Sequence, residues 1–112
     1  MSVISVYAVF ASDEEAERIG RLMVEERLAA CANILGPCRS IYRWEGAIEE
    51  AQEIAALFKT TADAADPLIA RLAALHSYDV PAAMVWPIET AHAPYVRWVA
   101  ESVKGEGAPP RD

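Results

Sequence analysis

The side chains best suited to chemistry are few and stand far apart in the sequence. Cys31 supplies a thiol, His76 an imidazole and Glu89 a carboxylate, while Lys59 adds a cation. Thiol and imidazole groups suit copper and zinc, so metal binding is one chemistry that these residue types could support. No two of these residues stand close enough in sequence to form a local motif, so the fold would have to bring them together.

Each of these residues also has a structural interpretation, and the sequence leaves both open. Cys31 lies where a predicted helix gives way to a strand, and a buried structural thiol is common at such a position. His76 ends a predicted helix, where an imidazole can complement the last carbonyl groups. Lys59 and Glu89 could each form an ordinary surface ion pair.

Compact catalytic motifs are missing from the sequence. There is no glycine-rich phosphate loop, no nucleophile elbow, and no Cys-x-x-Cys or His-x-x-x-His pair. This pattern favours a binding or signalling protein over an enzyme. An uncharacterised small-molecule enzyme whose site draws on distant positions stays the alternative.

Composition limits the class of protein. The chain has 112 residues, of which 54% are apolar, which predicts one folded domain over residues 1–104. The net charge of −7 argues against nucleic acid and permits cations. We expect no signal peptide and no membrane span, because apolar runs are interrupted by charges. Cys31 and Cys38 are expected to be reduced thiols in a cytoplasmic protein.

The first part of the chain predicts a strand followed by a helix. Val3–Phe10 is a nearly unbroken apolar run, which is typical of a buried strand. Ser12 and Glu15 match a capping box at a helix start. Apolar residues then recur at helical spacing, which predicts a helix over residues 13–29.

A long hairpin is predicted next. Residues 31–35 and 40–44 have strand character, with Gly36-Pro37 between them as a bulge or bend. Gly46 can adopt a positive φ at little cost, so Glu45-Gly46 is a natural turn. Tyr42 and Trp44 would then lie near the hairpin tip, where such aromatics are usually interface anchors.

The segment that follows the turn is ambiguous. Within residues 47–58, Ala51, Ile54, Ala55 and Phe58 fit one face of a helix, and the composition favours a helix. Ile54 and Phe58 equally share one face of a strand, and the threonines after them favour a strand. Local evidence does not decide between the two.

The remaining elements are clearer. We expect a helix over residues 63–75, a loop over 76–81, a strand over 82–88 and a third helix from Pro94. Residues 105–112 predict a disordered tail. If residues 47–58 form a strand, the order is β-α-β-β-α-β-α. This is an α+β, ferredoxin-like sandwich with an added C-terminal helix and a long central hairpin.

Several segments resemble the CutA family of divalent-cation tolerance proteins. They are ERLAACANI at residues 26–34, SIYRWEG at 40–46, KTT at 59–61, HSYDVP at 76–81 and PIE at 87–89. The resemblance covers residues 3–103. It implies a ferredoxin-like subunit with strands on both sides of Trp44, a tight homotrimer, and a role in tolerance of copper and other divalent metals.

The resemblance also suggests roles for particular residues. It implies a pocket at the subunit interface lined by Lys59 and Glu89, which Tyr78 and Asp79 could extend. It further implies a weak site for Cu²⁺ or another divalent metal, formed by His76 with Cys31 or Glu89. No tightly bound cofactor is expected. The family resembles nitrogen-regulatory PII proteins, so a PII-like signalling trimer or a scaffold trimer without metal is an alternative.

The chain departs from the family pattern at a few positions. Ser77 stands where the family usually has proline, and Ala82 where it usually has glutamate. The family's copper binding has been linked to a cysteine on the first strand, but Val9 and Phe10 at that strand's end cannot bind a metal. These departures predict that any metal site is weak.

Overall fold

The strands of this protein form one sheet in the order β2-β3-β1-β4, and neighbouring strands are antiparallel. The computed structural model describes residues 2–104. Its elements are β1 (Val3–Phe10), α1 (Asp13–Glu25), β2 (Cys31–Trp44), β3 (Ala47–Thr61), α2 (Ala62–Leu75), β4 (Ala83–Pro87) and α3 (Ala93–Lys104). The α+β, ferredoxin-like arrangement with an added helix is confirmed. The predicted tail at 105–112 lies outside the described residues.

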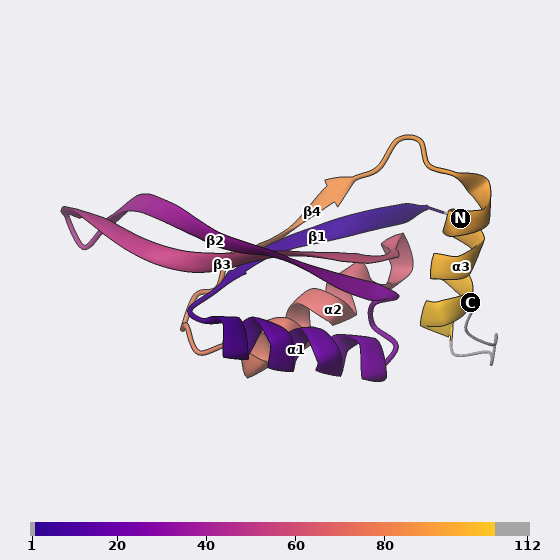
Figure 1. The fold of residues 1–112 in the computed structure, drawn as a ribbon, viewed down its shortest axis with the longest axis horizontal. Helices are drawn as coiled ribbons and strands as arrows, with labels where there is room; N and C mark the ends of the chain where they lie inside the picture. Colours follow the sequence, from indigo (N-terminus) through magenta and orange to yellow (C-terminus); the bar gives the residue numbers. More distant parts are fainter. Residues whose placement is uncertain (1, 105–112) are drawn as a thin grey trace.

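The two faces of the sheet differ in which helices pack against them. Figure 1 shows α1 and α2 on one face, and α3 beyond the end of the sheet at which β1 begins. Alternate residues of β1, namely Ile4, Val6, Ala8 and Phe10, belong to the core under α1 and α2. Their neighbours in sequence point to the opposite side, because successive strand residues alternate between faces. We call that side the open face.

The ambiguous segment is a strand, so its helical interpretation is wrong. β3 pairs with β1 from Val3↔Thr61 to Phe10↔Ile54, and with β2 along its other edge. Ile54, Ala56 and Phe58 alternate into the core and are almost fully buried. Hydrogen bonds on both edges and this burial outweigh the weak helix preference of the segment.

The first helix is shorter than predicted, because a backbone turn stops it at Glu25. Arg27 has φ 61°, in the left-handed region. The N–H of Leu28 donates to the carbonyl of Met23, and the N–H of Arg27 donates to that of Val24. This pair of bonds is the Schellman motif, which satisfies the last helical carbonyls. Leu28 continues the apolar stripe of the helix although it lies outside it.

The other predicted boundaries shift by one or two residues. The bulge lies just before the predicted Gly36-Pro37, because the β2–β3 register shifts between Ile34 and Gly36 and leaves Leu35 as the extra residue. β4 is shorter than the predicted 82–88, and α3 starts one residue before Pro94. Ser12 caps α1 as predicted by accepting from the N–H of Glu15, but the Glu15 carboxylate accepts from Ala11 N–H rather than Ser12 N–H.

The central hairpin extends well beyond the rest of the sheet. β1 ends opposite Ile54, whereas β2 and β3 stay paired out to Trp44↔Ala47. Glu45 and Gly46 turn the chain with φ values of 50° and 84°, as a two-residue hairpin loop of type I′ requires. We call residues 38–53 the arm. It gives the molecule a longest dimension of 48 Å against 27 and 23 Å (Figure 1).

Within residues 2–104, none of the helices combines the length and the apolar character needed to cross a bilayer.

A close approach between α1 and the sheet provides a test of this packing. A Cβ added at Gly20 in α1 would lie 3.3 Å from Cβ of Ala32 in β2. We expect Gly20→Val to lower the free energy of unfolding by about 1–3 kcal/mol, because overpacking forces the helix away from the sheet. Urea unfolding measures this. Arg21→Val, at the next and exposed position, is the control, and an equal loss in both variants would contradict the close approach.

Candidate functional site

The residues singled out in the sequence lie in separate regions of the chain. Cys31, Lys59 and Glu89 lie near the end of the sheet where β1 begins, since Cys31 pairs with Lys59 and Glu89 follows β4. His76, Tyr78 and Asp79 lie in the loop after α2, beside the end of β1. Tyr42 and Trp44 lie towards the tip of the arm.

The loop after α2 is held by a buried carboxylate. Glu15 is 5% exposed. Its Oε2 accepts from the N–H of Ser77 at 2.7 Å, and its Oε1 accepts from the Ser77 hydroxyl at 3.0 Å and from Ala11 N–H at 3.2 Å. A proline at position 77 could not donate the first of these bonds, so the serine adds a contact here.

These bonds set the protonation of Glu15. Burial alone would raise the pKa of this carboxyl, but the two hydrogen bonds from Ser77, the one from Ala11 and the nearby His76 together hold its pKa below its ordinary value. Glu15 is therefore a carboxylate at neutral pH. It joins the start of α1 to the loop that carries Tyr78 and Asp79.

His76 is buried, and both of its ring nitrogens are engaged. Nε2 lies 2.8 Å from the carbonyl oxygen of Val9 and donates to it, while Nδ1 accepts from the N–H of Tyr78 at 3.0 Å. The ring stacks on Phe10 with 5.0 Å between centroids. The imidazole therefore binds a carbonyl of β1, and not the helix carbonyls that the sequence suggested. A metal ion at either nitrogen would have to replace one of these bonds.

Tyr78 links this loop to the base of the arm. Its hydroxyl donates to Oε2 of Glu53 at 2.8 Å, and the Ser40 hydroxyl donates to Oε1 of the same carboxylate at 2.5 Å. Burial, followed by the bond to Glu53, raises the pKa of Tyr78 to about 12. The phenol therefore stays protonated at neutral pH. β1 ends opposite Ile54, and the loop that carries Tyr78 contacts β3 at the next residue, Glu53. We call Ser40, Glu53 and Tyr78 the arm clamp.

Two further side chains approach the arm clamp on the open face. Cys38 pairs directly with Glu53 across the hairpin. Tyr7 lies near both, and burial together with Cys38 and Glu53 raises the pKa of its phenol. The sequence does not single out Ser40 and Glu53, because each looks like an ordinary surface residue, and it indicates Glu15 only as part of the capping box of α1. Only the alternation of β3, which turns Glu53 towards the open face, could have indicated one of them.

A second polar cluster lies where β2 begins. Lys59 donates to the side-chain oxygen of Asn33 at 2.6 Å, and the Cys31 sulfur lies 3.8 Å from the same oxygen. The sulfur is also 3.6 Å from the hydroxyl of Tyr95 in α3. Burial, followed by the contact with Cys31, raises the pKa of Tyr95 to about 12. Lys59 thus binds an amide, and it takes part in none of the ion pairs formed within residues 2–104.

The predicted metal ligands do not converge within one chain. Lys59 lies six positions after Glu53 in β3, about 20 Å away at the usual strand rise, so the two polar clusters are distinct. Among residues 2–104, no three His, Cys, Asp or Glu side chains are grouped to hold a metal ion. The donor side chains within residues 2–104 of one chain therefore form no such group by themselves.

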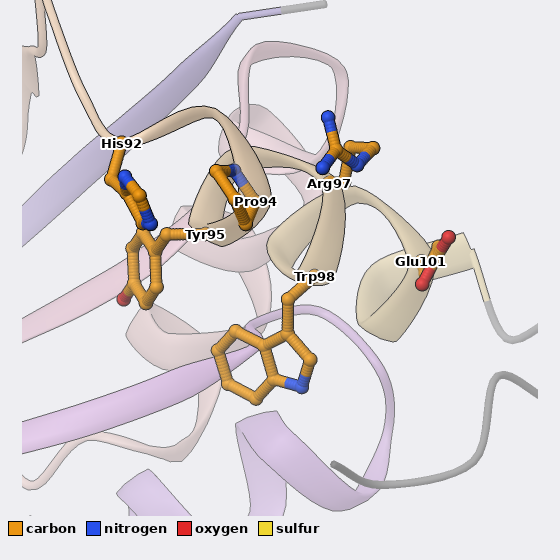
Figure 2. Close-up of a pocket in the computed structure, with 6 residues that line it drawn as sticks. All are labelled: His92, Pro94, Tyr95, Arg97, Trp98 and Glu101. Carbon is orange, nitrogen blue, oxygen red and sulfur yellow. The ribbon is translucent and has the colours of Figure 1, made fainter.

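A shallow groove of about 560 Å³ runs along α3. Its lining combines aromatic, charged and proline side chains (Figure 2): His92, Pro94, Tyr95, Arg97, Trp98 and Glu101. The Tyr95 and Trp98 rings lie 5.7 Å apart. Tyr95 belongs both to this groove and to the cluster around Cys31, so the groove borders that cluster.

The Glu15 network predicts a pH-dependent effect of Ser77→Ala. A carboxyl with a lowered pKa stabilises the fold above its unfolded-state pKa of about 4.3, and this stabilisation is lost as pH falls through the lower folded value. We expect Ser77→Ala to destabilise the protein by about 1.5 kcal/mol at pH 7. The difference from the unsubstituted protein should narrow at pH 3.

Urea unfolding at both pH values and one protein concentration measures this. Ser102→Ala in α3 is the control, since the Ser102 side chain has no part in the Glu15 network, and we expect it to change stability by less than about 0.5 kcal/mol. A Ser77→Ala effect of the same size at pH 7 and pH 3 would contradict a role for the Glu15 charge.

Comparison with known proteins agrees with this fold. The family model described as CutA1 divalent ion tolerance protein matches residues 4–102. The divalent-cation tolerance protein CutA of Thermus thermophilus is 45% identical over 91 residues, covering 81% of this chain and 88% of that protein. The protein of the same name from Pyrococcus horikoshii is 40% identical over 102 residues, covering 91% and 99%.

A solved structure gives the same result. The crystal structure of CutA from Xylella fastidiosa superimposes with a TM-score of 0.89 at 37% identity, covering 92% of this chain and 99% of that one. The names of these relatives describe tolerance of divalent cations and no reaction. The resemblance seen in the sequence is confirmed, and the chain belongs to the CutA1 family of divalent ion tolerance proteins.

Proposed function

We propose that the chain acts as a non-enzymatic homotrimer that binds divalent metal ions or a small ligand where subunits meet. The observation that carries this proposal is the large apolar surface that one chain leaves uncovered. On the open face, exposed large apolar side chains extend from the arm to the edge strand: Tyr42, Trp44, Met84 and Trp86. Contiguous apolar surface of this kind usually marks an interaction site.

The arm strengthens the argument because it is apolar on both faces. Trp44 on the open face is 55% exposed, and Ile41 and Ile48 on the other face are 65% and 63% exposed. No helix of the same chain reaches this part of the hairpin (Figure 1). A neighbour that covers both faces of the arm would remove this surface from water, at about 25 cal/mol per Å² of apolar area.

Open strand edges favour a ring of copies. Among residues 2–104, the outer edges of β2 and β4 have no partner strand, and β3 loses its β1 neighbour beyond Ile54. Unpaired edges invite strand pairing with another chain. A contact between two different edges of identical subunits closes into a ring when the rotation allows. That the ring has three subunits is what the resemblance to the CutA family implies.

We place the ligand between subunits because the polar groups of one chain lie in two separate clusters. A thiol, a lysine and a tyrosine lie at one end of the sheet, and the arm clamp lies at the other. We propose that a metal ion binds weakly, through His76, Cys31 or Glu89 of one copy with groups of the next, and is not a resident cofactor. Cys31 and Cys38 are free thiols, which fits the cytoplasmic location that we expect.

Light scattering tests the assembly. We expect a mass of about three times the 12.2 kDa subunit at micromolar concentration. Met84→Asp places a charge on the exposed open face and should shift the protein towards monomer, since an unpaired charge is costly to bury. Val24→Asp, at an exposed apolar position of α1 on the other side of the sheet, is the control. A monomeric mass for the unsubstituted chain would disprove the proposal.

Calorimetry tests the metal. We expect Cu²⁺ and Zn²⁺ to bind weakly, with Cu²⁺ the tighter as the general affinity order predicts. Binding should weaken as pH falls, because a protonated imidazole cannot act as a ligand. His76→Ala should reduce binding if the imidazole takes part. Equal binding by both proteins would remove His76 from the site, and no binding by either would leave a trimer whose ligand is not a metal.

A further inference from the structure

The two neighbours of the His76 ring fix which nitrogen carries its proton. The carbonyl of Val9 can only accept, so Nε2, which lies 2.8 Å from its oxygen, carries the proton and donates it. The N–H of Tyr78 can only donate, so Nδ1, at 3.0 Å, keeps its lone pair. The His76 side chain has no exposed surface, so water is not at hand to replace either partner. Both bonds therefore require one tautomer of a neutral ring.

Tyr78 is held at its backbone by this ring and at its hydroxyl by the arm. Its N–H donates to His76, and its hydroxyl donates to Oε2 of Glu53 at 2.8 Å. Its ring also lies against the imidazole, with 4.7 Å between centroids. Residues 77–80 lie in neither a helix nor a strand, so no ladder of backbone bonds fixes this loop. The bond to Nδ1 is thus what sets the place of the Tyr78 backbone.

Glu53 is the point at which the loop holds the arm. It stands one residue beyond Ile54, where pairing with β1 stops, and its backbone pairs only with β2. Two hydroxyl groups donate to its carboxylate, those of Ser40 and Tyr78. Ser40 belongs to the same hairpin, so of these two bonds only the one from Tyr78 ties the hairpin to another part of the chain.

A new partner at either ring nitrogen would break the bond to Tyr78. A partner at Nδ1 takes the lone pair that accepts from the Tyr78 N–H. A partner at Nε2 forces the ring proton onto Nδ1, where it would face that N–H and could not accept from it. The ring therefore cannot hold Tyr78 and bind another partner at the same time.

We propose that His76 is the positioning residue of the arm clamp, and that any other partner of its ring nitrogens releases Tyr78 and frees the base of the arm. The inference concerns a bond within one chain. It rests on the metal binding proposed above only for the nature of that other partner, and it gives the site a regulatory consequence, since occupancy at His76 would be read out as movement of the arm.

Two amide variants of His76 separate the two nitrogens. In His76→Asn the side-chain oxygen takes the place of Nδ1 and can accept from the N–H two residues later, as in an Asx turn. In His76→Gln the longer side chain takes the place of Nε2 and can donate to Val9, but it leaves the Tyr78 N–H without its acceptor. The two variants thus keep opposite halves of the imidazole.

Nuclear Overhauser effects between the Tyr78 ring and the Glu53 side chain measure the clamp, in the full chain protonated only at Tyr, Glu and Trp. We expect His76→Asn to keep this signal and His76→Gln to lower it about threefold or more, because a lost hydrogen bond shifts the loop equilibrium. The signal between the Tyr95 and Trp98 rings, which lie 5.7 Å apart, is the internal control and should persist in both variants.

The outcomes of this comparison are decisive in either direction. Retention in the Asn variant with loss in the Gln variant supports the proposal. Equal Tyr78–Glu53 signals in the two variants would overturn it, whether both persist or both vanish, because the Nδ1 bond would then not govern the clamp.

Titration with Zn²⁺, which is diamagnetic, tests the response to a second partner. If calorimetry shows that Zn²⁺ binding needs His76, the Tyr78–Glu53 signal should fall as the site fills. A signal that persists at saturation would overturn the proposal. If Zn²⁺ binds equally well to His76→Ala, the signal should stay unchanged, and its loss would place the coupling elsewhere and contradict us. If no metal binds, the metal proposal fails, and the Asn and Gln variants still decide this one.

Discussion

The structure depends on the unequal pairing of β3. Along one edge this strand bonds to β2 over nearly its whole length, but along the other edge β1 supports it only as far as Ile54. The paired part carries Ile54, Ala56 and Phe58 into the core, so its register is strongly fixed. The unsupported part becomes the arm. One mismatch in strand length thus creates both a well-packed domain and a surface that the domain cannot cover.

The end of β1 is also where the polar network is concentrated. The loop after α2 enters the space beside β3, and Tyr78 bonds there to Glu53 while Ser77 bonds to Glu15. These bonds tie the arm to β1 and α1, so the arm is held at its base. A hairpin held at its base presents its tip with less loss of conformational freedom than a loose loop, which favours association.

The fold was largely predictable because its signals are local or repeat along the chain. The apolar run of β1, the capping serine at position 12 and the Glu45-Gly46 turn all act within a few residues. The strand character of residues 47–58 was not decidable locally, since pairing with β1 decides it. The end of α1 at Glu25 was not predicted, because nothing in the sequence indicates that Arg27 adopts the positive φ that stops the helix.

The candidate site was less predictable because its parts meet only through tertiary structure. Glu53 and Tyr78 are 25 positions apart, and Cys31 and Tyr95 are 64 apart. Within one subunit these pairs lie at opposite ends of the sheet. Each of the two polar clusters is therefore assembled from positions far apart in the chain, so neither leaves a local motif that the sequence alone could reveal.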